Sequence, residues 1–239
     1  MTRLTRLSIA GQAHYVVLRS VKDISLIPSE QDIAALFRLF GFASERCYVD
    51  VNAYALFTEQ IHMLLTPRES GDDLSRFVQM VSRLYGRYFN DAYSRDGKIW
   101  QSRFESAVLQ GEGRLLKAVV YMEWLPFILG FGEPQFYHWS SYSHHSGYRS
   151  DIFMMPVREY WQLGNTPFER QKKYRDIFEQ GPDKAFGEQL LAAVKRGWPV
   201  ADSDFLDYCD IPAERARPSE AREDLRRHHL HIYLTLIKF

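Results

Sequence analysis

Two kinds of hydrophobic periodicity alternate along the first 110 residues, and their order restricts the fold. Runs of β-branched and aromatic residues, or strict alternation, predict strands, whereas apolar residues at three- and four-residue steps predict helices. The predicted strands cover 14–19, 47–57, 61–66 and 98–109, the last as one strand or a pair, and the predicted helices cover 29–41 and 74–88. Strand, helix, strand, strand, helix, strand is the split ferredoxin-like order. We therefore predict an α+β fold, an antiparallel sheet with helices packed on it.

Helical periodicity continues in the second half of the chain. Beyond a helix at 114–123, whose end Pro126 disturbs, a polar and aromatic connector follows at 140–151. Three more helices are predicted, at 156–163, 167–180 and 184–196. We predict two parts, a sheet domain of residues 1–145 and a small helical C-terminal extension with a polar tail, residues 146–239.

The charge balance gives no global signal. The 239 residues include 30 basic and 30 acidic side chains, so no net field marks a nucleic-acid-binding protein. Between Arg76 and Arg103, however, six basic residues stand against two acidic ones. This excess predicts a basic stripe or, alternatively, an ordinary solvated helix face. An apolar fraction of 46% excludes disorder as the main state.

The spacing of the cysteines and the distribution of apolar residues indicate no metal-binding motif, signal peptide or membrane span. Cys47 and Cys209 are far apart and lack a Cys-x-x-Cys spacing, so neither a zinc site nor a disulfide framework is indicated. The N-terminal residues lead into no apolar core of signal-peptide length. The apolar stretch 118–131 is cut by Glu123 and Pro126 and is too short to span a bilayer. We expect a cytoplasmic protein with no membrane partner.

Four short segments, taken together and in order, resemble one known family. They are Gln60-Ile61-His62, Gly97-Lys98-Ile99-Trp100-Gln101-Ser102-Arg103-Phe104, Tyr121-Met122-Glu123-Trp124-Leu125-Pro126 and Trp139-Ser140-Ser141-Tyr142. Their order and spacing resemble the one-tyrosine HUH transposases, and most closely the REP-associated tyrosine transposases of bacteria. The resemblance covers roughly residues 12–145, and its motifs are specific jointly rather than singly.

The resemblance implies cleavage of DNA assisted by a metal ion. In the family, two histidines separated by one apolar residue on a strand face the same way and bind a divalent metal, Mg²⁺ or Mn²⁺. A tyrosine on a helix attacks the scissile phosphate of single-stranded DNA and forms a 5′-phosphotyrosine. In this chain the resemblance assigns the nucleophile to Tyr121 and the second histidine to His62, whereas Gln60 replaces the first. A glutamine carbonyl can still bind a hard cation.

The third ligand position also differs from the family. An asparagine four residues after the tyrosine serves as a ligand from the same helix face, but here that residue is Leu125, which has no lone pair to donate. Glu123 lies about 200° around the helix from Tyr121 and is a poor replacement. Both changes affect metal-ligand positions, whereas the flanking segments keep the residues typical of the family. This pattern indicates a degenerate or repurposed transposase.

Two functions follow from this resemblance. The first is a transposase that binds hairpin-forming single-stranded DNA and cuts it through Tyr121 with Mg²⁺ or Mn²⁺. The second is a non-catalytic single-stranded DNA-binding protein that kept hairpin recognition. In both, Arg87, Lys98, Trp100 and Arg103 are the expected DNA contacts, because guanidinium groups and aromatic faces suit single strands. Trp100 fits a core anchor equally well. The protein is expected to be a monomer or a homodimer.

Simpler assignments exist for several of these residues. Without the resemblance, Tyr121 is a core tyrosine and His62 a hydrogen-bonded structural histidine, and the chain is an unrelated ferredoxin-like enzyme or RNA-binding module. His144-His145 is expected to be a surface pair, because adjacent residues do not converge on one face of a strand. His229-Leu230-His231 has the His-apolar-His spelling but lies in the terminal tail, where no metal site is expected.

Overall fold

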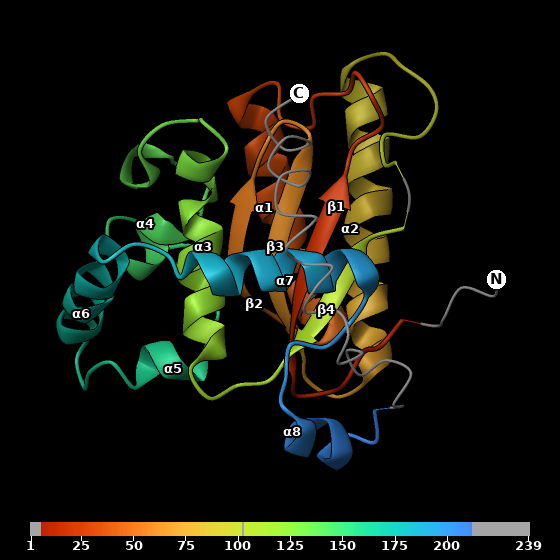
Figure 1. The fold of residues 1–239 in the computed structure, drawn as a ribbon. Coiled ribbons are helices and arrows are strands. Elements are labelled where there is room, and N and C mark those ends of the chain that lie inside the picture. The colour runs from red at the N-terminus through yellow and green to blue at the C-terminus, as the bar shows by residue number, and fades with distance from the viewer. Residues whose placement is uncertain (1–5, 102, 212–239) are drawn as a thin grey trace.

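Four strands of the described residues form one antiparallel sheet, in the order β2-β3-β1-β4 (Figure 1). The computed structural model describes residues 6–101 and 103–211. The strands are β1 (Ala13–Arg19), β2 (Val49–Leu56), β3 (Gln60–Pro67) and β4 (Glu105–Leu109). Each neighbouring pair is antiparallel, and β1 lies between β3 and β4. This strand order is that of the ferredoxin-like fold, so the predicted fold class is confirmed.

Helices α1 (Glu30–Cys47) and α2 (Gly71–Ala92) cover one face of the sheet. Each helix begins at a serine that is followed three residues later by an aspartate. In α2, the Asp73 carboxylate accepts the backbone N–H of Ser70 at 2.9 Å, which strengthens the start of the helix. The apolar stripes of both helices then pack on alternate side chains of the strands, so the first hydrophobic core lies between this face and the two helices.

The first helix is longer than the sequence predicts. The prediction ends it at Gly41, whereas α1 continues to Cys47. Ala43 and Cys47 are buried, so the apolar stripe runs past the glycine. A Cβ at Gly41 would lie 3.5 Å from Phe153, an ordinary contact, so the glycine sits within the helix without a special backbone requirement. The helix ends instead at Cys47 and is capped by Tyr48, which has φ 57°.

Helices α3 (Arg114–Ile128) and α7 (Lys184–Arg196) cover the opposite face. Figure 1 shows α7 crossing in front of the sheet, where it packs on β4 and β1, while α3 lies against β2. Ala55 and Ala107 are among the small side chains on this face, and small residues let helices approach a sheet closely. The predicted end of α3 is too early, because the helix continues through Pro126 for two more residues.

The remaining helices belong mainly to the second half of the chain. They are η1 (Pro134–Phe136), α4 (Tyr142–His145), α5 (Arg158–Trp161), α6 (Pro167–Glu179) and α8 (Ser203–Tyr208). Helices α5, α6 and α7 confirm the three helices predicted there. The division after residue 145 stays a prediction, and the 229–231 histidines lie outside the described residues. In the described part of the chain, none of the helices is long and apolar enough to cross a membrane.

The segment before β4 is not a strand of the sheet, contrary to the prediction of an extended element over 98–109. Trp100 forms only an isolated bridge with Ser20. Its indole Nε1 donates to the backbone carbonyl of Ser82 in α2 at 2.8 Å. The tryptophan therefore fastens this segment to α2, and the regular ladder between β4 and β1 runs from Glu105 to Leu109.

Candidate functional site

The sheet face beneath α3 and α7 carries the strand in which metal ligands were predicted. In β3, Ile61 packs in the core under α1 and α2, whereas Leu64 packs in the core under α3 and α7. Because side chains alternate along a strand, Gln60 and His62 lie on the same face as Leu64. The contact of His62 with Tyr15, another residue of that core, agrees with this placement. The predicted shared face of Gln60 and His62 is confirmed.

A tyrosine of β1 occupies the position beside His62. The Tyr15 hydroxyl lies 2.9 Å from His62 Nδ1, and Phe57 packs edge-on against the imidazole with ring centroids 5.8 Å apart. His62 Nε2 is buried and has no hydrogen-bond partner among the described residues. Burial and, to a smaller extent, the Arg19 charge lower the pKa of His62 to about 3. The imidazole is therefore neutral at physiological pH.

The side chain of Gln60 is held by an arginine of β1. Arg19 Nη1 donates to Gln60 Oε1 at 2.5 Å, and Arg19 Nε forms an ion pair with Glu105 at 3.5 Å. The guanidinium charge therefore lies against the carbonyl oxygen that was expected to face a metal. A second cation at that oxygen would be repelled.

The residues at this face do not fit a divalent metal ion. A metal site needs several lone pairs directed at one point. Here Tyr15 contacts Nδ1 of His62, Arg19 binds the oxygen of Gln60, and Leu125 has no donor atom to offer. In residues 6–101 and 103–211, no group of three His, Cys, Asp or Glu side chains could hold a metal ion.

Tyr121 lies on the same side of the sheet as His62, but α7 covers it. The residue is 5% exposed and belongs to the same hydrophobic core as Tyr15. A Cβ built on Gly187 of α7 would stand 1.9 Å from Cε2 of Tyr121, so the backbone of α7 lies directly against the ring. Burial and the neighbouring Tyr121 both raise the pKa of Tyr15. The tyrosine assigned as the nucleophile is therefore a core residue in this arrangement.

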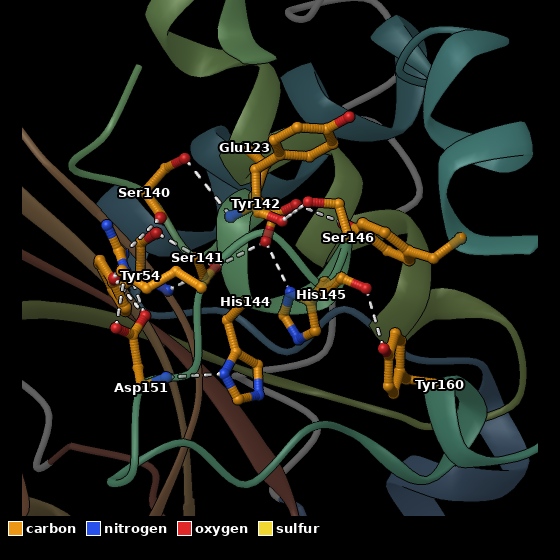
Figure 2. Close-up of polar contacts among 12 residues, drawn as sticks. Tyr54, Glu123, Ser140, Ser141, Tyr142, His144, His145, Ser146, Asp151 and Tyr160 are labelled. Carbon is orange, nitrogen blue, oxygen red and sulfur yellow. Dashed lines mark hydrogen bonds and ion pairs between the residues drawn. The ribbon is translucent and has the colours of Figure 1, made fainter. Parts of the chain in front are cut away.

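Glu123 points away from this face into a buried polar cluster (Figure 2). Its Oε1 accepts hydrogen bonds from Ser141 Oγ at 2.6 Å and from His145 Nδ1 at 2.7 Å, and its Oε2 accepts one from the Tyr174 hydroxyl. All four side chains are fully buried. The predicted angular offset of Glu123 from Tyr121 is confirmed. The cluster ties α3 to α4 and α6 and has no exposed atom with which to meet a substrate.

The prediction of a surface pair at His144-His145 is wrong. His145 is fully buried, and the Tyr160 hydroxyl donates to its backbone carbonyl at 2.8 Å (Figure 2). His144 Nδ1 accepts the backbone N–H of Asp151 at 3.1 Å. The pair lies on α4, where successive side chains point about 100° apart, so each ring makes different contacts. The cost of burying His145 is offset by its hydrogen bond with Glu123.

Trp100 makes the contacts of a core anchor. Its indole donates to Ser82, and its ring packs against Tyr85 with centroids 6.1 Å apart. A Cβ at Gly86 would lie 3.8 Å from the indole nitrogen, so the ring rests on the α2 backbone. Of the two alternatives for Trp100, these contacts favour the anchor over a residue that stacks on DNA.

The other predicted DNA contacts gather on and beside α2. Arg87 has a side chain that is 84% exposed, and Arg83 is exposed one turn before it. Lys98 and Arg103 are exposed in the segment that Trp100 fastens to the same helix. We call Arg83, Arg87, Lys98 and Arg103 the α2 basic surface. These four exposed cations come from two segments of the sequence, α2 and the segment that Trp100 fastens to α2.

Three residues of the site, Tyr15, Arg19 and Gly187, were not predicted from the sequence. A signal existed for the first two, because alternation places Tyr15 and Arg19 on one face of β1, and the ferredoxin-like order sets β1 beside β3. No local pattern marks Gly187. Its contact with Tyr121 depends on how α7 crosses the sheet.

The sheet order, with a tyrosine-bearing helix packed over a histidine-bearing strand, defines a ferredoxin-like α+β protein. Among solved structures, it is similar to a REP-associated tyrosine transposase bound to a REP hairpin, with a TM-score of 0.52 and 17% identity over 64% of this chain and 88% of that chain. A candidate transposase from Deinococcus radiodurans R1 aligns with a TM-score of 0.33 and 14% identity over 48% of this chain and 85% of that chain. No family model and no curated protein matches the sequence. The chain thus shares the fold of a tyrosine transposase.

Proposed function

We propose that this protein descends from the tyrosine transposases and binds hairpin-forming single-stranded DNA without cutting it. The order of the sequence motifs and the shared fold support the descent, and the solved structure with that fold contains a REP hairpin. One observation carries the loss of cleavage: the Gly187 backbone of α7 lies against the ring of Tyr121.

The buried face explains why cleavage is not expected. Tyrosine attack on a phosphodiester requires the hydroxyl to approach the phosphorus in line and requires stabilisation of the charge on the phosphate oxygens. Tyr121 is covered by α7, and the neutral His62 supplies no positive charge. Arg19 is cationic, but Glu105 and Gln60 already engage its guanidinium group. Neither access nor charge stabilisation is provided in this arrangement.

The α2 basic surface supports binding to DNA. Exposed cations that neutralise phosphates supply most of the affinity for nucleic acids, and they make it depend on salt. Arg83 and Lys98 form no ion pair within the described residues, and the Arg87 pair with Asp91 is long, at 3.9 Å. These charges remain available to phosphate groups even though the whole chain is neutral.

The binding arm of the proposal is tested by fluorescence anisotropy with a labelled hairpin at several salt concentrations. Arg87→Ala should weaken binding and lower the slope of log K against log[salt] by about 0.7–1. Lys195→Ala is the matched control, because Lys195 is exposed on α7 at the opposite face of the sheet. An Arg87 variant that binds like the original protein contradicts the assignment of this surface.

The cleavage arm uses the same hairpin with Mg²⁺ or Mn²⁺ in the buffer, resolved on a denaturing gel. We expect a shifted band on a native gel and no covalent protein–DNA band on the denaturing one. A covalent band that disappears in Tyr121→Phe would overturn the loss of cleavage. Failure to bind the hairpin would overturn the proposal as a whole.

An active transposase is the second candidate function. One observation favours it: Tyr121 and His62 lie in one layer on the same face of the sheet, each next to Tyr15. In that case α7 has to leave the face before DNA reaches Tyr121. Cleavage that appears only in the double variant Gln60→His/Leu125→Asn would assign the loss of activity to the altered ligand positions.

A further inference from the structure

A second group of basic side chains lies on the helices at the opposite side of the molecule from α2, on and around α6 (Figure 1). Between residue 147 and the end of α6 at residue 179, the chain carries six basic and five acidic side chains. The basic residues are Arg149, Arg158, Arg170, Lys172, Lys173 and Arg175, and the acidic ones are Asp151, Glu159, Glu169, Asp176 and Glu179.

Three of these five acidic side chains are engaged in contacts within the protein, whereas Asp176 and Glu179 are exposed in the last turn of α6. Asp151 forms an ion pair with Arg149 at 2.8 Å. Glu159 accepts two backbone N–H groups at the start of α3, at 2.8 and 2.6 Å, and Glu169 accepts two at the start of α6, at 2.8 and 3.2 Å. Within the described residues, the other five cations form no ion pair with a carboxylate. Their charge is therefore available to a partner.

Exposed aromatic rings stand among these cations. Phe168, Lys172 and Arg175 follow one another at four- and three-residue steps, so they lie along one side of α6. Tyr148 lies at the end of this row, with its ring centroid 5.9 Å from the guanidinium carbon of Arg175. Phe168 is 82% and Tyr148 is 70% exposed. We call these four residues the α6 strip, which is about 10 Å long from Phe168 to Arg175.

We propose that the α6 strip binds single-stranded nucleic acid, with bases stacked on Tyr148 and Phe168 and phosphates at Lys172 and Arg175. A single strand presents flat bases and charged phosphates in alternation, and aromatic and cationic side chains meet both. Arg175 is already oriented, because its Nη1 donates to the backbone carbonyl of Ser146 at 2.5 Å. The inference rests on the proposed function in one respect: the strand that it binds is the unpaired stretch next to the hairpin.

The test compares three labelled DNAs by fluorescence anisotropy with the full-length protein: a hairpin, the same hairpin with an oligo-dT tail, and oligo-dT alone. The tail should tighten binding of the original protein by roughly tenfold, because one stacked base contributes about that factor or more. The double variant Tyr148→Ala/Phe168→Ala should lose this gain and keep its affinity for the hairpin without a tail. Lys172→Glu should lose the gain as well.

Phe136→Ala is the matched control, because Phe136 is 73% exposed and lies on η1, outside the strip. Thermal melts check that each variant is folded. A tail that gives no gain, or a gain that survives in the double variant, overturns the inference while hairpin binding still supports the proposed function. Conversely, oligo-dT binding through the strip without hairpin binding supports the strip and overturns the proposed function.

An anionic membrane surface is the other partner that such a strip could meet, and vesicles containing phosphatidylserine test it. Two results together would overturn the nucleic-acid assignment. The original protein would bind the vesicles and lose this binding in Lys172→Glu, and its affinity for the hairpin would not change when the oligo-dT tail is added. We expect no such vesicle binding.

Discussion

Replacing Gly187 by alanine tests whether α7 closes the face that carries Tyr121. The added Cβ would stand 1.9 Å from Cε2 of Tyr121, and ordinary carbon contacts are about 3.5–4.0 Å. The ring or the helix must therefore shift by roughly 1.5 Å in a packed core, and a clash this severe lies in the upper part of the range for overpacking, about 2–3 kcal/mol. Alanine also favours a helix interior over glycine by about 1 kcal/mol. We expect a net loss of about 1–2 kcal/mol in the free energy of unfolding.

Urea unfolding at constant m-value measures this change, and a thermal melt should show a Tm lower by about 2–8 °C. Gly41→Ala is the matched control, because Gly41 also lies inside a helix but its Cβ would meet Phe153 at 3.5 Å, without a clash. That variant should gain up to about 1 kcal/mol. In a Tyr121→Ala background the clash is gone, so Gly187→Ala should no longer destabilise the protein.

A Gly187→Ala variant as stable as the original protein, alongside a Gly41→Ala variant that behaves as expected, would show that α7 does not lie against Tyr121. The face of the sheet would then be open to DNA. The proposed loss of cleavage depends on the same contact and would be refuted with it.

Three further predictions concern the buried polar groups and Trp100. Burial lowers the pKa values of His14 and His62 to about 4 and about 3, so below pH 6.5 the unfolded chain takes up protons that the native state does not. The free energy of unfolding should therefore fall by about 1.4 kcal/mol per pH unit for each histidine as the pH decreases below 6.5. The urea midpoint, measured at pH 6 and at pH 5, should fall less in His14→Gln than in the original protein, and an equal fall would contradict this prediction. Glu123→Leu should cost about 3–5 kcal/mol in urea unfolding, more than Glu123→Gln, because it leaves the buried donors of His145 and Tyr174 without an acceptor; equal losses would refute the role of the carboxylate. Trp100→Phe should lose about 1 kcal/mol with its hydrogen bond to α2 and leave hairpin affinity unchanged, whereas a tenfold weaker affinity at equal stability would show that the ring stacks on DNA.

The strand and helix order was predictable because periodicity is a local property. Alternation in β3 was enough to place Gln60 and His62 on one face, and the angle between Tyr121 and Glu123 followed from helix geometry. The errors arose where a distant contact decides the outcome. Gly41 continues its helix because the residues after it are buried, and His145 is buried because Glu123 accepts its hydrogen bond. Neither the burial of the residues after Gly41 nor the contact between Glu123 and His145 can be read from the local sequence pattern.

The sequence by itself determined the fold class, the faces of its strands and the side chains present at each position of the resembling motifs. Only the tertiary structure decided which of those side chains meet. Tyr15 approaches His62 because β1 and β3 are neighbours, and Gly187 covers Tyr121 because α7 crosses the sheet. Spacing along a strand or helix fixes the direction of a side chain, but whether its hydroxyl or imidazole reaches solvent depends on which helix packs above it.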